Sequence, residues 1–412
     1  MPRTEEKNLA NIQDEVSMAM RDSRSTGLSR REAIRLLGAS AGLGAATVLG
    51  EELGFAQAQP GWLTAGRATP VTFPKGAIIR TILKDVPPEA LASGATMFHE
   101  HLGGSYVTPS PPSAPYVEGR ETGVPARGTP APPPPPETSI DLMVDEVKQA
   151  GKDGVIGIVD ANASGRARTD KQIDFLKQIA TRAPSVHVIV AGGPFKAPYP
   201  SDLVAKTVDQ LADQFVQESI RQRWGAFGEI GTSMEMTAEE RKVLTALAKA
   251  QVRTGLPLFS HTEHQGCAKC ALDQLDLFES NGVDLKHLVI GHLTDIKPGS
   301  EPLGQTAKAI AKRGAFLGFD TVGHEMRASR NPEAGKVQMV LELIKAGYED
   351  QLLLAADFSY SPQLKANWGS GFSTVVVQFV PKLRYAGVND ATLRKILVDN
   401  PRRFLSFVPK KG

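Results

Sequence analysis

Ala95-Thr96-Met97-Phe98-His99-Glu100-His101 combines a short apolar run with two histidines at its C-terminal end. Such a run predicts a buried strand. Residues two positions apart on a strand point to the same face, so His99 and His101 can bind one metal ion together. Parallel (β/α)8 barrels place their active sites at the C-terminal ends of their strands, which is where these histidines lie.

The same pattern, an apolar run followed directly by a metal-ligand residue, recurs further along the chain. The later residues at predicted strand ends are Glu229, His261, His292 and Asp357. The chain contains only eight histidines, and four of them occupy such positions. A lone His-x-His motif is a weak signal, but followed by these ligands in this order it predicts a metal centre and indicates a metal-dependent hydrolase.

Eight strand-like runs are expected in all, most of them starting about 30 residues apart, which is the length of one βα unit. Helical periodicity lies between them, most clearly at residues 207–223, 238–254 and 336–346. Eight such units in a row predict a closed (β/α)8 TIM barrel of the α/β class. The expected strands are residues 95–98, 155–159, 186–191, 225–227, 257–260, 288–290, 315–319 and 352–355.

Two further segments belong to the same expected domain. Residues 78–91 alternate like a strand and then turn, which predicts an N-terminal hairpin ahead of the barrel. Residues 108–138 are dominated by Pro, Gly, Ser and Ala and form a Pro-rich insertion after the first strand. This composition cannot bury a core. A passive surface loop is favoured over a lid or specificity loop, although long loops often have a function.

The N-terminal segment predicts export. Arg30 and Arg31 precede the mildly apolar residues 36–49, and an Ala-x-Ala cleavage pattern closes the segment at Ala58. Residues 1–58 are therefore expected to be a twin-arginine signal, with a mobile amphipathic tail as the alternative. We expect a linker at 59–75, the barrel at 76–412, export by the twin-arginine machinery, and a periplasmic or secreted location.

Net charge limits the kinds of binding partner that are expected. A net charge of +2 argues against a nucleic-acid-binding surface and against stable membrane association, so a small-molecule substrate is expected. Cys267 and Cys270 form a lone Cys-x-x-Cys pair. A zinc site would need two more ligands, so a structural or incidental pair is favoured, and a local disulfide is compatible with export.

Four stretches carry a resemblance to a known family. Residues 228–233 (GEIGTS), 318–323 (GFDTVG), 364–367 (LKAN) and 400–404 (NPRRF) are similar to the phosphotriesterase family of the amidohydrolase superfamily, and most of all to its homology-protein branch. The resemblance extends from about residue 78 to residue 407. It implies two divalent metal ions, with zinc the expected metal, and a homodimer.

The resemblance also implies a role for each ligand. His99 and His101 match the pair that binds the more buried ion together with Asp357, and two further histidines, His261 and His292, match ligands of the more exposed ion. Glu229 stands where many relatives have a carboxylated lysine that bridges both ions. A structural glutamate is the alternative for that position.

The expected chemistry follows from two ions that share a bridging hydroxide, which attacks a carbonyl or phosphoryl centre while Asp357 accepts a proton. An ester, lactone or phosphoester is the expected substrate. A mononuclear amidohydrolase (amidase or deaminase) and a non-catalytic periplasmic metal-binding barrel are the alternatives. Thr321 stands where the lactonase branch typically has arginine, which argues against lactonase activity on quorum signals.

Residues in the loops at the expected barrel mouth are candidates for substrate contact. Phe195 follows the third strand, where family members often place an aromatic residue. His264 is near the site but is expected to face solvent. The other candidates follow the seventh and eighth strands and are His324, Lys365 and Trp368.

Overall fold

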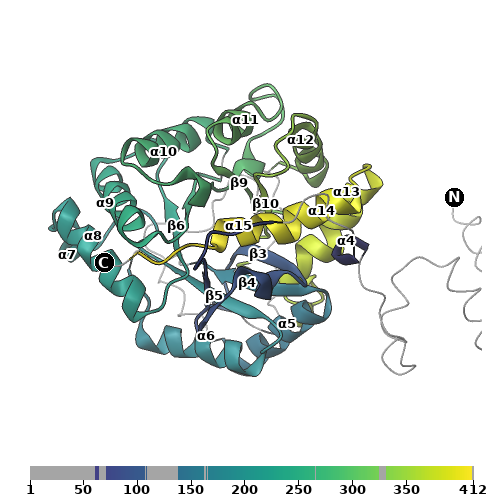
Figure 1. Ribbon diagram of the computed structural model, residues 1–412, viewed down its shortest axis with the longest axis horizontal. Coiled ribbons are helices and arrows are strands. Elements are labelled where there is room, and N and C mark those ends of the chain that lie inside the picture. Colours follow the sequence, from purple (N-terminus) through teal and green to yellow (C-terminus); the bar gives the residue numbers. More distant parts are fainter. Residues whose placement is uncertain are drawn as a thin grey trace, which may run out of the picture. The chain divides into compact units, whose positions relative to one another are not determined.

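The computed structural model (Figure 1) describes residues 61–64, 71–106, 108, 138–161, 164, 166–264, 266–323 and 331–410. Eight parallel strands follow one another around a nearly closed barrel, each hydrogen-bonded to its neighbours in sequence order. This confirms the predicted fold class. The strands are β3 (Ala95–Glu100), β4 (Val155–Asp160), β5 (His187–Gly192), β6 (Ala226–Gly231), β7 (Leu258–His261), β8 (Leu288–Ile290), β9 (Phe316–Phe319) and β10 (Leu352–Leu354).

One strand differs from its predicted length in a way that affects the site. β6 was expected to end at Phe227, but it continues to Gly231 and therefore contains Glu229. The pairing of β6 with β7 shifts register between Phe227 and Ile230. Such an irregularity re-aims side chains within a strand, and a hydrophobic run does not reveal it.

Helices alternate with the strands and form the outer ring in Figure 1. A Thr-x-x-Gln/Glu capping box begins three of them, at Thr169, Thr207 and Thr237, and satisfies backbone N–H groups that have no partner within the helix. The helices are α5 (Ile140–Lys152), α6 (Asp170–Arg182), α7 (Ser201–Val204), α8 (Val208–Arg221), α9 (Ala238–Thr254), α10 (Ala268–Ser280), α11 (Gln305–Lys312) and α12 (Glu333–Lys345).

Shorter helical segments complete the chain. Two π-helical turns, Val375–Phe379 and Lys395–Asp399, run into the last helices. The remaining α-helices are α4 (Gly61–Thr64), α13 (Val380–Tyr385), α14 (Asp390–Arg394) and α15 (Asn400–Leu405).

The strands bury both faces, as parallel strands do. In β8, Val289 belongs to the core inside the barrel, whereas Leu288 and Ile290 belong to the core between the strands and the helices. Phe98 and Phe259 also fill the interior, where their rings meet edge to face at 6.2 Å. The barrel interior is therefore packed, and the site is confined to its mouth.

The opposite end of the barrel is closed by the predicted N-terminal hairpin and by α15. The hairpin pairs β1 (Ile79–Arg80) with β2 (Asp85–Val86), and a 3-10 turn follows at Pro88–Leu91. A Cβ atom at Gly225, just before β6, would lie 2.3 Å from the Arg80 carbonyl oxygen. The hairpin therefore packs directly against this end of the strand. From α15, the Phe404 carbonyl oxygen lies 3.1 Å from Nδ1 of His287, just before β8.

A buried carboxylate joins the first strand to the last. The two oxygens of Glu100 accept hydrogen bonds from the backbone amides of Ala356 and Phe358, each at 2.9 Å. The amide of Asp357, between them, donates to the His99 carbonyl oxygen at 3.1 Å. Nearby, the Tyr106 hydroxyl donates a hydrogen bond to the carbonyl oxygen of His101 at 2.5 Å. These bonds hold the chain after β10 beside β3.

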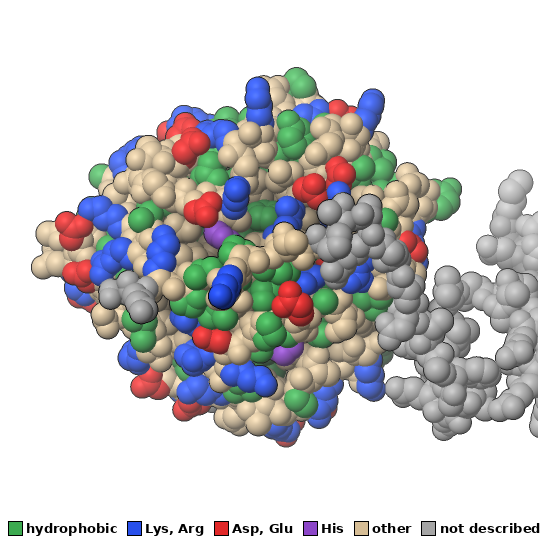
Figure 2. All heavy atoms as spheres, viewed as in Figure 1, with side chains coloured by type: hydrophobic (Ala, Val, Ile, Leu, Met, Phe, Trp, Pro, Cys, Tyr) green, Lys and Arg blue, Asp and Glu red, His purple; other side chains and the backbone are tan. Residues whose placement is uncertain are grey.

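Ion pairs connect consecutive outer helices. Figure 2 shows Lys and Arg side chains interspersed with Asp and Glu on the visible face. Several pairs bridge neighbours in the ring, among them Arg182–Asp141, Arg221–Asp170, Lys249–Asp209, Arg253–Asp213 and Arg313–Asp276. Exposed pairs of this kind each contribute about 0–1 kcal/mol, so the cores rather than the pairs stabilise the ring.

Within the described part of the chain, no helix is long and apolar enough to cross a bilayer.

Several sequence predictions fall on parts of the chain that are not described. The expected signal, residues 1–58, lies outside the described residues, as does the Pro-rich insertion except for its first and last positions. These interpretations stay predictions.

Cys267 and Cys270 form a disulfide across the first turn of α10, which resolves the Cys-x-x-Cys pair in favour of a structural role.

Replacing Glu100 with alanine should destabilise the barrel, because two buried backbone amides lose their acceptor. Each such group costs about 1–3 kcal/mol, so a loss of about 2–6 kcal/mol is expected in urea unfolding followed by circular dichroism. Glu89→Ala, at an exposed position in the 3-10 turn, is the matched control and should change stability by less than about 0.5 kcal/mol. Equal stability of the two variants would contradict the role of Glu100 in joining β3 to the chain after β10.

Candidate metal centre

The structure brings all six predicted metal ligands to the mouth of the barrel. His99 lies in β3 and His101 directly follows it, while Glu229 lies in β6 and His261 ends β7. The other two ligands occupy the turns after β8 and β10, where the backbone is left-handed, with φ of 55° at His292 and 45° at Asp357. All six side chains are buried.

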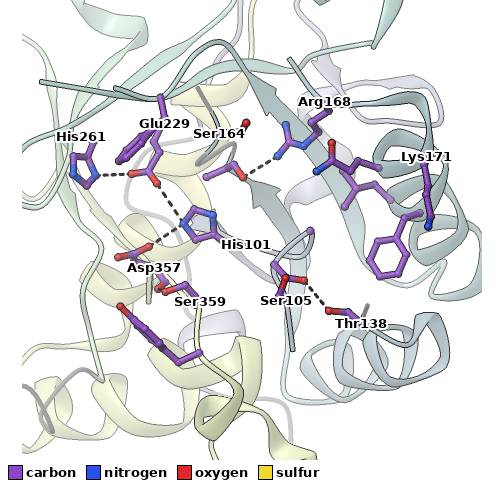
Figure 3. Close-up of a pocket in the computed structure, with 18 of the residues that line it drawn as sticks. His101, Ser105, Thr138, Ser164, Arg168, Lys171, Glu229, His261, Asp357 and Ser359 are labelled. Atoms are coloured by element: carbon purple, nitrogen blue, oxygen red, sulfur yellow. Dashed lines mark hydrogen bonds and ion pairs between the residues drawn. The ribbon is translucent and has the colours of Figure 1, made fainter. Parts of the chain in front are cut away.

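Glu229 lies at the centre of the cluster (Figure 3). Its Oε1 is 3.4 Å from His101 Nε2, and its Oε2 is 2.7 Å from His261 Nδ1. Oε2 also lies 3.3 Å from His99 Nε2 and 3.6 Å from His292 Nε2. One carboxylate thus faces histidines from opposite sides of the barrel mouth.

Four of the candidate ligands, Glu229 among them, form a compact group. Oδ1 of Asp357 lies 3.0 Å from His101 Nε2 and 3.8 Å from His99 Nε2. One ligand atom from each of His99, His101, Glu229 and Asp357 lies within 4.8 Å of all the others. A single ion can therefore contact all four residues.

The other two histidines meet on the opposite side of Glu229. Nε2 of His292 is 2.6 Å from Nδ1 of His261. Two ring nitrogens at this distance can share one proton, but they cannot both carry a proton toward each other. Both nitrogens also face Oε2 of Glu229, so the pair offers two donors for a second metal position beside the first.

Asp320, at the end of β9, orients two of the imidazoles. Its Oδ2 lies 3.0 Å from His99 Nδ1, and its Oδ1 lies 2.9 Å from His292 Nδ1 and accepts the His292 backbone amide at 2.8 Å. Both rings therefore turn Nε2 toward Glu229. Metal-ligating histidines commonly bind a carboxylate through the ring nitrogen that does not face the metal, which fixes the tautomer.

The residues present fit divalent metal ions. The Nε2 atom of His99 is fully buried, yet among the described residues it has no partner with hydrogen-bonding geometry. An orphaned buried nitrogen of this kind is costly unless something binds it. Imidazole and carboxylate donors suit Zn, Mn, Co, Ni and Fe. The cluster can therefore hold metal ions.

The electrostatics of the cluster are compatible with bound cations. Burial lowers the pKa of His99, but the Glu229 and Asp320 carboxylates outweigh burial and raise this pKa well above its ordinary value. Burial lowers the pKa of His292 as well, but Asp320 raises it to about 10. Burial raises the pKa of Asp357, yet the bond to His101 and the charge of His99 hold it well below its ordinary value. Without metal, protons on the imidazoles balance the buried carboxylates, and metal binding must displace them.

A cavity of about 530 Å³ opens above the cluster. His101, Glu229, His261 and Asp357 line one end of it, as Figure 3 shows. Phe195, predicted to contact substrate, lines the same cavity, and its ring meets that of His261 edge-on at 4.7 Å.

Comparisons with known proteins identify the family of this chain. A model of the phosphotriesterase family matches residues 85–405. The chain belongs to this family. An N-acetyltaurine hydrolase from Danio rerio is 29% identical over 362 residues, which cover 80% of this chain and 98% of that protein.

Two solved structures extend the match to three dimensions. The phosphotriesterase homology protein from Escherichia coli, crystallised with phosphate in its active site, superposes with a TM-score of 0.61 at 25% identity, covering 76% of this chain and 98% of that one. A lactonase from Listeria monocytogenes superposes with a TM-score of 0.63 at 25% identity, covering 80% and 99%. Relatives that are hydrolases support the prediction that this member of the phosphotriesterase family is a hydrolase.

Two of the other predicted substrate contacts do not reach the cavity. Lys365 forms an ion pair with Asp153, and its backbone amide donates to Glu146, which ties the loop after β10 to α5. Trp368 is 92% exposed and does not line the cavity. A role for these two residues in this cavity is therefore not supported. His324 lies outside the described residues.

Other cavity residues were missed or misjudged from the sequence. Arg168, Lys171 and Gln172 line the wall opposite the metal ligands, at the start of α6. The Arg168 guanidinium is buried and paired with Asp160, at the end of β4. His264 was expected to face solvent, but it lines the cavity with a side chain that is 36% exposed, and its Nδ1 lies 3.1 Å from Asp295. For Arg168 and Lys171, the only sequence signal was a charged residue in the segment after the predicted strand 155–159.

Asp320→Asn should weaken metal binding without removing a ligand. Asparagine keeps the shape but can present only one oxygen to the two imidazoles, and loss of such an outer partner typically costs about 10–100-fold in metal affinity. Competition against a fluorescent zinc chelator measures this affinity. Asp174→Asn, on the exposed face of α6, is the control and should not change it. Unchanged affinity in Asp320→Asn would show that Asp320 does not orient the ligands.

Proposed function

We propose that this chain is a binuclear metal-dependent hydrolase that acts on an ester, lactone or phosphoester, with zinc as the metal. The position of Glu229 carries the proposal. Its Oε1 faces His101, which is bound to Asp357. Its Oε2 faces His261 and His292 and also lies near His99. A carboxylate so placed is suited to bridge two cations.

The mononuclear alternative explains less of the cluster. One ion held by the group around His99 and Asp357 would leave His261 and His292 at the barrel mouth with their ring nitrogens 2.6 Å apart. Burial and the neighbouring His292 lower the pKa of His261 to about 4, so this ring is neutral near pH 7 and able to coordinate. A second ion gives both rings a ligand role, which supports the binuclear site.

The metal ions and the residues around them have different roles in the proposed reaction. Bound divalent ions supply Lewis-acid polarisation of the scissile carbonyl or phosphoryl group and activation of a water molecule. Asp357 lines the cavity, so its carboxylate is placed to accept a proton from the attacking nucleophile. Phe195 offers an apolar face beside His261 against which the body of the substrate can pack.

Amide hydrolysis is a second candidate, favoured by the match to nearly the whole length of an N-acetyltaurine hydrolase. Amides and carboxylic esters share an electrophilic carbonyl, so the same ligands would serve both. The opposite wall, with Lys171 and Gln172, provides polar contacts for a substituent remote from the scissile bond. A phosphoester remains in the proposal because a structural relative holds phosphate in its active site.

Metal content is the first test. Protein purified without chelator should contain two ions per chain, and removal of both should abolish hydrolysis of a panel of lactones, carboxylic esters, N-acetyl amino compounds and phosphoesters. Reconstitution with Zn²⁺ should restore activity on one class of this panel. A single ion per chain with full activity would replace the binuclear proposal by the mononuclear one. Two ions without turnover of any class would favour a metal-binding protein.

Asp357→Asn should retain metal and lose turnover. Asparagine preserves an oxygen ligand but cannot accept a proton, and general-base catalysis contributes about 10²–10⁴-fold. We expect kcat to fall by at least about 100-fold, measured on the most active substrate of the panel, while two ions remain bound. The exposed Asp174→Asn serves again as the control and should keep wild-type kcat. An Asp357→Asn variant with normal turnover would remove the proton-transfer role.

A further inference from the structure

We infer that His264 is a third imidazole ligand of the more exposed metal ion and that Asp295 holds it in place. The inference rests on the proposed binuclear site and adds a donor that the predicted ligand set lacks. The ion would be a divalent transition metal, bound by His261, His264 and His292 with Glu229 shared between the two ions.

The three rings lie against one another at the barrel mouth, edge to face or tilted. The His264 ring centroid lies 4.8 Å from that of His261 and 4.3 Å from that of His292. One ligand nitrogen from each of the three residues lies within 4.8 Å of the other two. The three residues therefore lie close enough together to contact one ion.

Asp295 repeats for His264 what Asp320 does for His99 and His292. Its Oδ2 lies 3.1 Å from His264 Nδ1, so Nε2 is the ring nitrogen that would coordinate. The Asp295 side chain is fully buried, and the Thr321 hydroxyl donates to its other oxygen at 2.8 Å. A buried carboxylate is costly unless an ionic or hydrogen-bonding role compensates it. Placement behind an imidazole that faces other imidazoles is the arrangement of a carboxylate–histidine–metal triad.

Thr321 gains a role in this arrangement. It also hydrogen-bonds Thr294 at 2.7 Å, so the turns after β8 and β9 are joined behind His264. Asp295 ends the 3-10 turn Leu293–Asp295 that His292 begins. The same short turn thus supplies one ligand and orients another.

A third imidazole changes which metals the exposed position prefers. With three nitrogens and one carboxylate oxygen, the site favours Zn²⁺, Co²⁺ or Ni²⁺ over Mg²⁺ and Mn²⁺, which prefer oxygen ligands. The ion at this position should therefore resist chelators more strongly than two histidines alone would allow.

The test compares His264→Gln with the wild type in metal stoichiometry and in the visible absorption of the Co²⁺-substituted protein, both independent of turnover. We expect wild type to hold two ions and the variant to lose one of them at chelator concentrations more than about 100-fold lower, because loss of a ligand exceeds the 10–100-fold cost of an outer partner. The Co²⁺ absorption bands should shift with loss of the nitrogen donor. Asp295→Asn should weaken the same ion by about 10–100-fold. His187→Gln, at the opposite end of the barrel at the start of β5, is the control and should change neither property.

The outcomes separate the two proposals. Two tightly bound ions and an unchanged Co²⁺ spectrum in His264→Gln would overturn the ligand role of His264 and leave the binuclear function intact. Fewer than two ions in the wild type would overturn the binuclear function itself. If His264→Gln does not fold, Asp295→Asn decides: an unchanged affinity and spectrum in this variant would overturn the inference.

Discussion

Closure of the sheet between β10 and β3 is the constraint on which the site depends. The ligands come from strands and turns that span the whole barrel, and His101 and Asp357 belong to its first and last units. Glu100 holds these units together by accepting the amides on either side of Asp357. Because it lies between His99 and His101, the residue that closes the barrel is part of the same motif as the ligands. Fold and metal centre therefore share one short segment.

The second constraint is charge. Glu229, Asp320 and Asp357 are all buried, and His99 lies beside each of them. Burial alone would strongly disfavour three carboxylates. The imidazoles around them compensate, but each also directs a ring nitrogen toward the space beside Glu229. Divalent ions in that space would neutralise the carboxylates and leave the imidazoles unprotonated. The charges thus favour the metal-loaded protein over a barrel that merely contains histidines.

The sequence revealed those parts of the site that are local in the chain. An apolar run followed by a possible ligand residue is visible without any structure, so the eight strands and the six candidate ligands that meet at the barrel mouth could be located. The register shift that extends β6 to Gly231 could not, because it depends on pairing with β7. Lys365 was misplaced because the loop after β10 folds onto α5, where Glu146 and Asp153 bind it. The His264–Asp295 pair was missed since its members are 31 positions apart and meet only when β7 and β8 lie side by side.

The candidate ligands lie at strand ends, whereas other cavity residues lie in loops, and this difference bears on which substrate the site accepts. Relatives named for an amide and for a lactone share this fold, so the barrel and its strand-end ligands do not select between those substrates. We therefore attribute selection to residues in the loops above the cluster. In this chain the described candidates are Phe195, beside His261, and the start of α6 with Lys171 and Gln172 on the opposite wall. A substrate that reaches from Glu229 to α6 has to present its scissile group at one end and a polar group at the other. A compact substrate with no remote polar group would leave that wall unused.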